Sequence, residues 1–338
     1  MKNCLVVLGM HRSGTSALTG VLERVGVDLG NELMTPAADN PSGFFENTLV
    51  VDTNEAILAA SGSAWDSPFA LANNWQDKLT DNTLAQSASA FIQSNITSEH
   101  VYALKDPRLS RLLPWWQSLF VKAGVTGRYV ILVRHPLEIA DSLAARNGLS
   151  QTHSLLLWMH YMLEAERYTR GQPRAFVHYH DLLDDPVATV QGVFSRCGLP
   201  APDNLQAAAA DFIKNDMRHH SADNEALQTR CPALTAELYS ALSRLARSGQ
   251  ENESDAEKLD NLAAAFTEAQ ALYYSPEIMA AVADRRLLPD DLRSFLSSPP
   301  WQIYRAYQHA VYRWLPEGTP LRTFLQRAKK ALLPSSRD

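Results

Sequence analysis

The fold of this chain is decided by the stretch Cys4-Leu5-Val6-Val7-Leu8-Gly9-Met10-His11-Arg12-Ser13-Gly14-Thr15-Ser16. The apolar run from Leu5 to Leu8 is typical of a strand covered on both faces. A helical pattern follows the glycine-containing turn, with one apolar face made by Ala17, Leu18, Val21, Leu22 and Val25. In a strand–turn–helix unit, backbone N–H groups and the positive end of the helix dipole converge on one point. The stretch therefore predicts an anion site.

The spacing from Gly9 to Ser16 is that of a phosphate-binding P-loop, GxxxxGK[ST], with one departure. Thr15 stands where the lysine belongs, and the cation is Arg12, inside the loop. An ATP or GTP hydrolase needs that lysine and a carboxylate at the end of a neighbouring strand. The apolar run Tyr129 to Val133 ends instead in Arg134-His135-Pro136. This sequence lacks both features, so a nucleotide-dependent kinase is kept only as the weaker of the functions considered.

Three more apolar runs are predicted as strands: Val101 to Leu104, Tyr129 to Val133 and Ala175 to Tyr179. Helical patterns follow most of them, and strands that alternate with helices indicate a parallel sheet with right-handed crossovers. The predicted fold is α/β, a P-loop-type open parallel sheet flanked by helices, with additional C-terminal helices. From Pro186 to about Leu287 the chain is expected to be helical, with an exposed loop at Ser248 to Ser254.

A length of 338 residues allows one large domain with an appended helical region. We predict a core at 1–200, a helical extension of the same domain at 201–295, and a basic aromatic helical tail at 296–338. From Trp301 on, seven Lys and Arg oppose two acidic residues, so this part carries +5 and the rest −11 of the total −6. Aromatics among arginines suit an anionic membrane surface, and packing on the protein body explains them equally well.

Composition excludes several classes of protein. The hydrophobic fraction of 46% and the charged fraction of 20% are those of a globular chain. The negative net charge disfavours nucleic acid as a partner. Cys4, Cys197 and Cys231 are too few and too far apart for a disulfide framework or a metal cluster, so we expect no metal. Without a spanning segment, the expected location is the cytoplasm, with the inner membrane surface as a peripheral site.

Several separate segments carry a resemblance to a known family. They are Gly9 to Ser16, Asn40 to Asn47, Leu104 to Arg108, Val133 to Pro136 with Ser142, and Tyr179 to Pro186. Together they resemble the sulfotransferase superfamily that uses 3′-phosphoadenosine 5′-phosphosulfate (PAPS), in its bacterial, glycan-type form. The resemblance covers about Leu5 to Leu199. It implies transfer of a sulfuryl group from PAPS to a hydroxyl of a carbohydrate or glycolipid acceptor.

The resemblance also implies the donor-binding residues. The 5′-phosphosulfate would be held by the loop residues His11, Arg12, Ser13, Gly14, Thr15 and Ser16. The 3′-phosphate would be held by Arg134 and Ser142. Independently, an arginine at the carboxyl end of a strand points into the crevice where open α/β sheets bind ligands. Ser142 lies about two helical turns further on and faces the same point if the helix packs over the sheet.

Sulfuryl transfer needs a base for the acceptor hydroxyl and a cation for the leaving oxygen. Glu46 is the first candidate for the base, because the aromatic pair before it, with Phe44 as an acceptor-pocket residue, would raise its pKa. Asp39 and His11 are alternatives. Lys105, with Arg12, is the candidate electrostatic catalyst and Arg108 the candidate acceptor contact; an ion pair within their turn is the structural alternative. A non-catalytic nucleotide-binding partner of glycan assembly is the rival outside enzymes.

Overall fold

The computed structural model describes residues 1–36, 40, 43–79, 82–213 and 224–273. Residues 1–35 and 42–266 form one compact unit, and the other unit, 36–41 and 267–338, lies almost wholly outside the described residues. The predicted tail at 296–338 and the alternative base Asp39 fall there too. The domain boundaries at residues 200 and 295 remain predictions.

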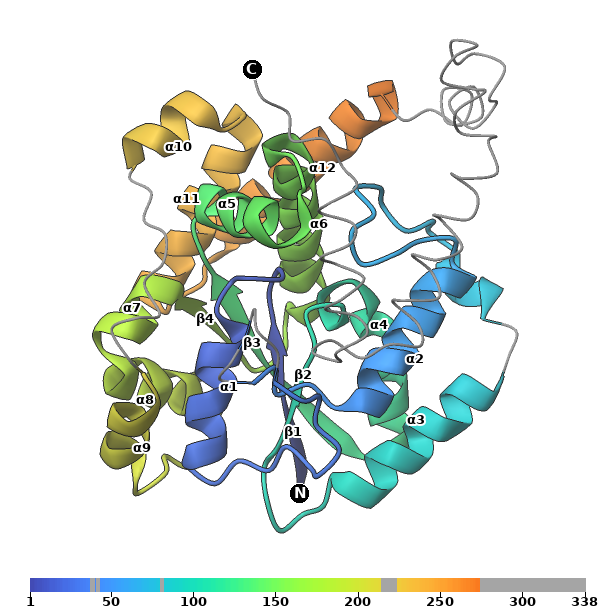
Figure 1. Cartoon of the computed structure of the whole chain (residues 1–338), viewed down its shortest axis with the longest axis vertical. Coiled ribbons are helices and arrows are strands. Elements are labelled where there is room, and N and C mark those ends of the chain that lie inside the picture. The colour runs from blue at the N-terminus through green and yellow to red at the C-terminus, as the bar shows by residue number, and fades with distance from the viewer. Residues whose placement is uncertain (37–39, 41–42, 80–81, 214–223, 274–338) are drawn as a thin grey trace, which may run out of the picture. The chain divides into compact units, whose positions relative to one another are not determined.

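Four parallel strands form the sheet, in the order β2-β1-β3-β4 (Figure 1). They are β1 (Lys2–Leu8), β2 (Tyr102–Lys105), β3 (Val125–Val133) and β4 (Arg174–His178). The predicted α/β class and parallel sheet are confirmed. In the register, Val7 lies opposite Lys105, Leu8 opposite Ile131, and Val133 opposite His178. The carboxyl ends of the strands, with the loops that follow them, therefore meet at one edge of the sheet.

Helices cover both faces of the sheet, because alternate side chains of each strand are apolar and buried. Leu5 and Val7 of β1 pack in one core with α1 (Thr15–Arg24), α7 (Tyr179–Asp184), α8 (Pro186–Arg196) and α9 (Leu205–Phe212). Cys4, Val6 and Leu8 pack in the other core. This second core also takes side chains from α2 (Thr48–Ala60), α3 (Asn82–Asn95), α4 (Leu109–Ala123), α5 (Pro136–Asn147), α6 (Gln151–Thr169), α11 (Ala233–Ser248) and α12 (Glu253–Tyr273).

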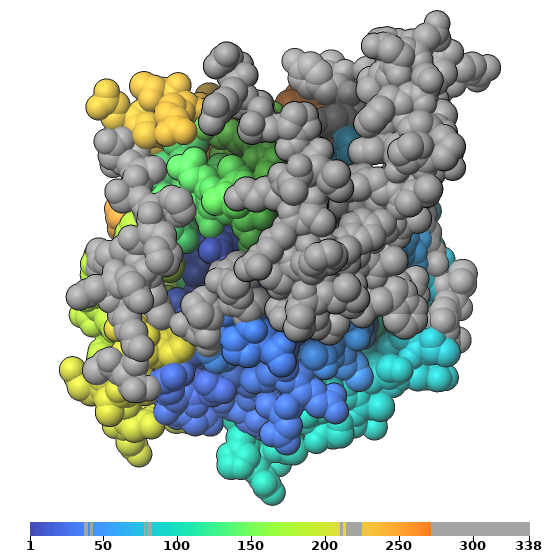
Figure 2. Space-filling view, in the orientation of Figure 1, coloured from blue at the N-terminus to red at the C-terminus, as the bar shows by residue number. Residues whose placement is uncertain are grey.

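Helices from both layers reach the same face of the molecule (Figure 2). In the space-filling view, the blue-to-cyan part of the chain, which carries α1, α2 and α3, lies beside the yellow-green part with α8 and α9 (Figure 2). Two short helical segments complete the described elements: the 3₁₀ helix η1 (Trp75–Lys78) and α10 (Asn224–Arg230).

Two helices at the site begin with side-chain caps that stand next to predicted functional residues. Asn47 precedes α2, and its Oδ1 accepts hydrogen bonds from the N–H groups of Leu49 and Val50. His135 precedes α5, and its Nδ1 accepts from the N–H of Leu137, with Pro136 in the first turn. Each cap fixes the backbone where its helix begins, and the residue just before the cap is a predicted site residue. Glu46 and Arg134 are therefore held at defined helix starts.

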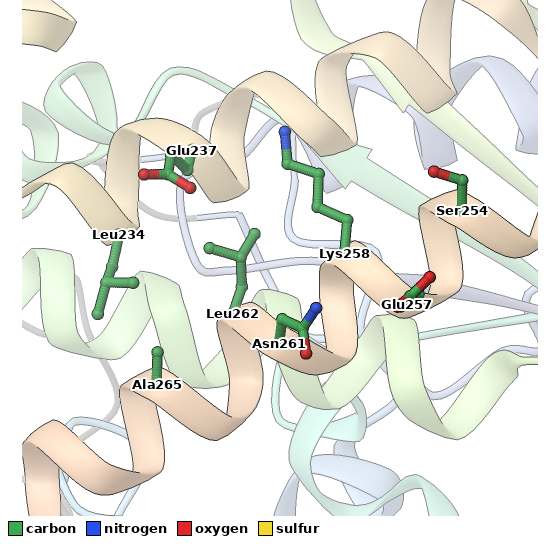
Figure 3. Close-up of a pocket in the computed structure, with 8 residues that line it drawn as sticks. All are labelled: Leu234, Glu237, Ser254, Glu257, Lys258, Asn261, Leu262 and Ala265. Atoms are coloured by element: carbon green, nitrogen blue, oxygen red, sulfur yellow. The ribbon is translucent and has the colours of Figure 1, made fainter.

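The predicted C-terminal helices are confirmed as far as Tyr273, and residues 249–252 form the loop inside the predicted polar stretch. A hollow of about 420 Å³ lies between α11 and α12. Side chains of α12, among them Lys258, point toward α11 across it (Figure 3). Its lining residues are Leu234, Glu237, Ser254, Glu257, Lys258, Asn261, Leu262 and Ala265. None of the predicted site residues lines this hollow.

Candidate functional site

The loop between β1 and α1 contains three residues with positive φ: Gly9, Arg12 and Gly14. Gly9 has φ 142°, and a Cβ there would lie 2.7 Å from Ser13 Oγ. The Gly9 N–H donates to Ser110 Oγ (3.0 Å), and Ser13 Oγ donates to the Met10 carbonyl (2.6 Å). Arg12 adopts φ 68°, which is costly for a residue with a side chain and is typical of functional sites. The Ser13 hydroxyl therefore stabilises the turn by bonding the backbone three residues earlier.

Gly14 of the loop lies against the ring of Tyr179, which directly follows β4. Gly14 has φ 95°, and a Cβ there would lie 2.2 Å from Tyr179 Cδ2, so only glycine fits. The prediction that Tyr179 ends a strand is wrong, because it is the first residue of α7. Thr15 follows in the first turn of α1, is buried, and its carbonyl accepts a hydrogen bond from Thr19 Oγ1. The start of α1 thus packs tightly against the start of α7.

The two residues predicted to hold the 3′-phosphate meet at Arg12. Ser142 Oγ accepts a hydrogen bond from Arg12 Nε (2.8 Å), and Arg134 Nη1 donates to the Arg12 carbonyl (2.9 Å). The Arg134 guanidinium also lies 4.2 Å from the centre of the Tyr179 ring. Arg134 and Ser142 are both nearly buried. The structure therefore brings together three residues that lie up to 130 positions apart.

Glu138 is a site residue that the sequence reasoning missed. Its carboxylate accepts from Arg134 Nε (2.8 Å) and from His180 Nε2 (2.9 Å), and it is fully buried. Burial alone would raise the pKa of Glu138, but the hydrogen bonds from His180 and Arg134 lower it to about 2. Glu138 lies in the first turn of α5, four residues after Arg134, and this short spacing was the available signal.

A second cluster surrounds Lys105 at the end of β2. Its Nζ donates to Glu46 Oε1 (2.6 Å), to the Phe44 carbonyl (2.8 Å) and to Ser16 Oγ (3.2 Å). Both charged side chains are almost fully buried. Burial raises the pKa of Glu46 above its ordinary value, and the charge of Lys105 opposes that rise. Phe45, between the two contacts, has φ 58°. The predicted base and the predicted cation thus form one buried pair at the first turn of α1.

Arg108 faces acidic partners on α2 and in its own turn. Its side chain bonds Glu55 and Asp106 Oδ1, and the other Asp106 oxygen accepts from Asn54 Nδ2 (2.8 Å). Asn54 in turn accepts from Trp116 Nε1 (2.8 Å). The ion pair inside the turn, which was the structural alternative, is present: one oxygen of Asp106 bonds Arg108 and the other bonds Asn54. Phe44 is partly exposed, and its carbonyl contacts Lys105 rather than this network.

His11 points into an aromatic box. Its ring centre lies 4.6 Å from that of Trp65 and 5.8 Å from that of Tyr161. Nε2 of His11 is buried and has no hydrogen-bond partner among the described residues. Burial, together with the charges of nearby arginines and Lys105, keeps the pKa of His11 well below its ordinary value. His11 is therefore neutral at pH 7.

With this geometry in place, the comparison with known families decides the assignment. The model of the sulfotransferase family matches residues 5–203, which is more than half of the chain. The chain belongs to the sulfotransferase family. The match spans both clusters described above, and the resemblance inferred from the motifs is confirmed at the level of the family.

Three solved structures are similar to this sulfotransferase in fold. The sulfotransferase domain of the Synechococcus PCC 7002 olefin synthase is 18% identical, with a TM-score of 0.41 over 78% of this chain and 94% of that one. The sulfotransferase domain of the curacin biosynthetic pathway is 14% identical (TM-score 0.39; 79% and 98%). Sulfotransferase STF9 from Mycobacterium avium is 17% identical (TM-score 0.37; 66% and 69%). No curated protein matches the chain.

Two further observations bear on cofactors and membranes. Within residues 1–36, 40, 43–79, 82–213 and 224–273, no three His, Cys, Asp or Glu side chains are grouped as they would be around a metal ion. No helix in that part of the chain combines the length and the apolar character needed to cross a bilayer.

Proposed function

We propose that this sulfotransferase moves a sulfuryl group from PAPS to a hydroxyl of a carbohydrate or glycolipid. One observation carries the proposal. Cationic side chains contact the P-loop and the first turn of α1 in two groups: Arg134 bonds Arg12, which bonds Ser142, and Lys105 bonds Ser16. PAPS carries a phosphate on its 3′ oxygen and a phosphosulfate on its 5′ oxygen. Two groups of this kind, if each binds one of these anionic groups, suit that donor better than a linear triphosphate.

On the 5′ side, the first-turn N–H groups of α1 face the phosphosulfate together with Ser16 and Thr15. Lys105 Nζ donates to Ser16 Oγ (3.2 Å), and this contact with the first turn of α1 supports a role for its ammonium in stabilising negative charge on the bridging oxygen. On the 3′ side, Arg134 and Ser142 hold the phosphate, and Arg12 connects the two. Positioning and electrostatic stabilisation supply the rate in this scheme, as they do in phosphoryl transfer.

Glu46 is the proposed base. The acceptor oxygen forms a bond to sulfur, the bond from sulfur to the bridging oxygen breaks, and the acceptor proton passes to the Glu46 carboxylate. The products are the sulfate ester and adenosine 3′,5′-bisphosphate. A carboxylate with a raised pKa is a stronger base than an exposed one, and Lys105 keeps it ionised while donating to it. Phe44 and Arg108 border the acceptor side.

The donor is tested by calorimetric titration with adenosine 3′,5′-bisphosphate, with AMP and with ATP plus Mg²⁺. We expect the bisphosphate to bind most tightly. In Ser142→Ala the preference for bisphosphate over AMP falls by about tenfold, because one hydrogen bond to a charged group is lost. Preference for ATP would favour the kinase alternative. Binding of the bisphosphate with no sulfate transfer from PAPS to any glycan acceptor would favour the non-catalytic partner.

The base is tested by Glu46→Gln, which keeps the hydrogen bond from Lys105. We expect kcat to fall by about 10²- to 10⁴-fold with the affinity for adenosine 3′,5′-bisphosphate unchanged. In the wild type, kcat rises with pH through the raised pKa of Glu46, because the base works only when ionised; the variant lacks this limb. Near wild-type kcat in Glu46→Gln removes Glu46 from the mechanism and leaves His11 and Asp39.

We also propose that the protein works in the cytoplasm and touches the inner membrane surface through residues 296–338. What supports this is the sequence alone, in which arginines and interface-favouring aromatics alternate from Trp301 on. A glycolipid acceptor presents its sugar at such a surface.

A further inference from the structure

Helix α11 lies outside the stretch that the sulfotransferase family model matches, which ends at residue 203. The helix nevertheless packs against β3 and β4, the two strands that Arg134 and Tyr179 directly follow (Figure 1). Tyr239 is one of the residues on its buried face. A helix from beyond the matched region therefore contacts the part of the sheet at which the proposed 3′-phosphate site lies.

Tyr239 reaches the end of β4 through a hydrogen bond. Its hydroxyl lies 3.0 Å from His178 Nε2, and both residues are buried. Burial lowers the pKa of His178 to about 4, so its ring is neutral at pH 7. His178 is the last residue of β4, and the next residue, Tyr179, places its ring against the Arg134 guanidinium (4.2 Å) and against Gly14. The hydrogen bond thus holds the backbone from which the Tyr179 ring projects.

The same tyrosine contacts the end of β3. The centres of the Tyr239 and His135 rings lie 5.0 Å apart, in an edge-to-face arrangement. His135 directly follows Arg134, and its Nδ1 accepts a hydrogen bond from the Leu137 N–H at the start of α5. That helix carries Ser142. A displacement of His135 would therefore move both Arg134 and the helix that presents Ser142.

The two contacts of Tyr239 act on neighbouring points of the sheet. Val133 lies opposite His178 in the parallel register, so Arg134 and Tyr179 leave the sheet side by side. The contact between the guanidinium and the ring depends on how both chains leave their strands. Groups that bind a ligand must be held close to the binding geometry by the residues behind them. Tyr239 is placed to do this at both strand ends.

We propose that Tyr239 is a positioning residue for the 3′-phosphate site, and that α11 thereby completes the donor site from outside the matched region. The assignment rests on the proposed function, in which Arg134 and Ser142 hold the 3′-phosphate. Tyr239 acts through the histidines at the two strand ends, which fix where Arg134 and Tyr179 leave the sheet. Binding of a 5′-phosphate by the P-loop does not need this link.

The test measures binding of adenosine 3′,5′-bisphosphate and of AMP by calorimetry, because the two ligands differ only in the 3′-phosphate. Tyr239→Phe keeps the ring and removes the hydroxyl. We expect its affinity for the bisphosphate to fall about threefold, with the affinity for AMP unchanged. Tyr239→Leu also removes the ring contact with His135 and lowers bisphosphate affinity about tenfold. In both variants KM for PAPS rises by the same factor, and kcat is unchanged.

Tyr102→Phe is the matched control. Tyr102 is also buried, and its hydroxyl donates to the Leu29 carbonyl (2.9 Å), but it lies at the start of β2, at the opposite end of the sheet from Arg134. We expect this variant to unfold at lower urea concentration and to keep the wild-type preference for the bisphosphate over AMP. A wild-type preference in Tyr239→Leu, or an equal loss in Tyr102→Phe, overturns the positioning role. Tyr239→Phe decides the same question should Tyr239→Leu not fold.

A failure of the proposed function would look different. Wild-type protein that binds the bisphosphate and AMP equally overturns the proposed donor, and the link from Tyr239 to Arg134 is then decided without nucleotide. The measurement is a double-mutant cycle of Tyr239→Phe and Arg134→Gln, followed by urea denaturation. We expect the double variant to lower the urea midpoint by less than the sum of the two single shifts. Additive shifts overturn the link.

Discussion

At the scale of single residues, Glu138 joins Arg134 to His180 and so holds one side of the proposed donor site. Its ordinary pKa of 4.5 falls to about 2 in the fold, because His180 and Arg134 donate to the ionised carboxylate and outweigh the effect of burial. Such a lowering corresponds to about 3 kcal/mol of stabilisation, present above pH 4.5 and lost as pH falls through about 2.

Glu138→Gln keeps the shape of the side chain and removes its charge. We expect the free energy of unfolding at pH 7 to fall by about 1–3 kcal/mol, measured by urea denaturation, with the gap from wild type constant down to about pH 5 and narrowing by about pH 3. Affinity for adenosine 3′,5′-bisphosphate also falls, since Arg134 loses its anchor. The control is Glu257→Gln, an exposed acid on α12. A gap that widens on acidification would contradict this assignment.

Some of these contacts could be predicted from residue spacing in the sequence, and others could not. Arg134 and Ser142 share one strand–helix unit, so their convergence follows from local geometry. His180 lies 42 positions from Glu138, and Trp65 reaches His11 from a loop after α2. Such pairings depend on how the helices pack across the sheet, which no local pattern encodes. Arg108 is an intermediate case. Its ion pair with Asp106 within the turn could be predicted from the sequence, but its contact with Glu55 on α2 could not.

At the scale of elements, the contact between the start of α1 and the start of α7 holds the P-loop. Gly14 meets the Tyr179 ring, whereas Gly26, just after α1, has the same kind of positive φ (91°) but lies in open space, where a Cβ would meet no atom within 4 Å. Alanine substitutions at these two glycines therefore distinguish the effect of backbone strain from that of a steric clash. Gly26→Ala introduces strain alone, and Gly14→Ala introduces both.

We expect Gly26→Ala to lower the free energy of unfolding by about 1–2 kcal/mol and to leave nucleotide affinity unchanged. Gly14→Ala lowers stability further and weakens adenosine 3′,5′-bisphosphate binding at least about tenfold, because α1 and Tyr179 must separate and Arg134 stacks on the same ring. Urea denaturation and calorimetry measure the two effects. Equal losses in both variants would mean that the Tyr179 contact does not position the loop.

The strands were the most predictable elements, since each is a buried apolar run. Their limits were less so. β3 begins at Val125, four residues before the predicted run, because Arg128 is accommodated in the strand by a hydrogen bond to Asn3 Oδ1 (2.9 Å). β4 stops at His178, and Tyr179 turns into α7 to pack on Gly14. In both places a tertiary contact, absent from the local pattern, sets the boundary.

At the scale of the whole molecule, charge is divided unequally along the chain. Residues up to 300 carry a net −11, whereas those from Trp301 on carry +5. The proposed anionic donor would therefore be met by a few cations within an acidic body, and we expect non-specific attraction to anionic surfaces to come from the tail. A membrane of anionic lipid would attract the tail by about 1 kcal/mol per basic residue near the surface and repel the body.

This division predicts that full-length protein cosediments with vesicles of phosphatidylglycerol and phosphatidylcholine, and that protein ending at residue 300 does not. Binding falls steeply as salt rises from about 50 to about 300 mM, because exposed charges are screened. Lys329→Gln with Lys330→Gln gives an intermediate loss, and vesicles of phosphatidylcholine alone are the lipid control. Sulfate transfer to a soluble acceptor is unaffected by the truncation, since the P-loop, Lys105 and Glu46 all lie in the compact unit. Equal cosedimentation of the two proteins would instead place the aromatic residues of the tail against the protein body.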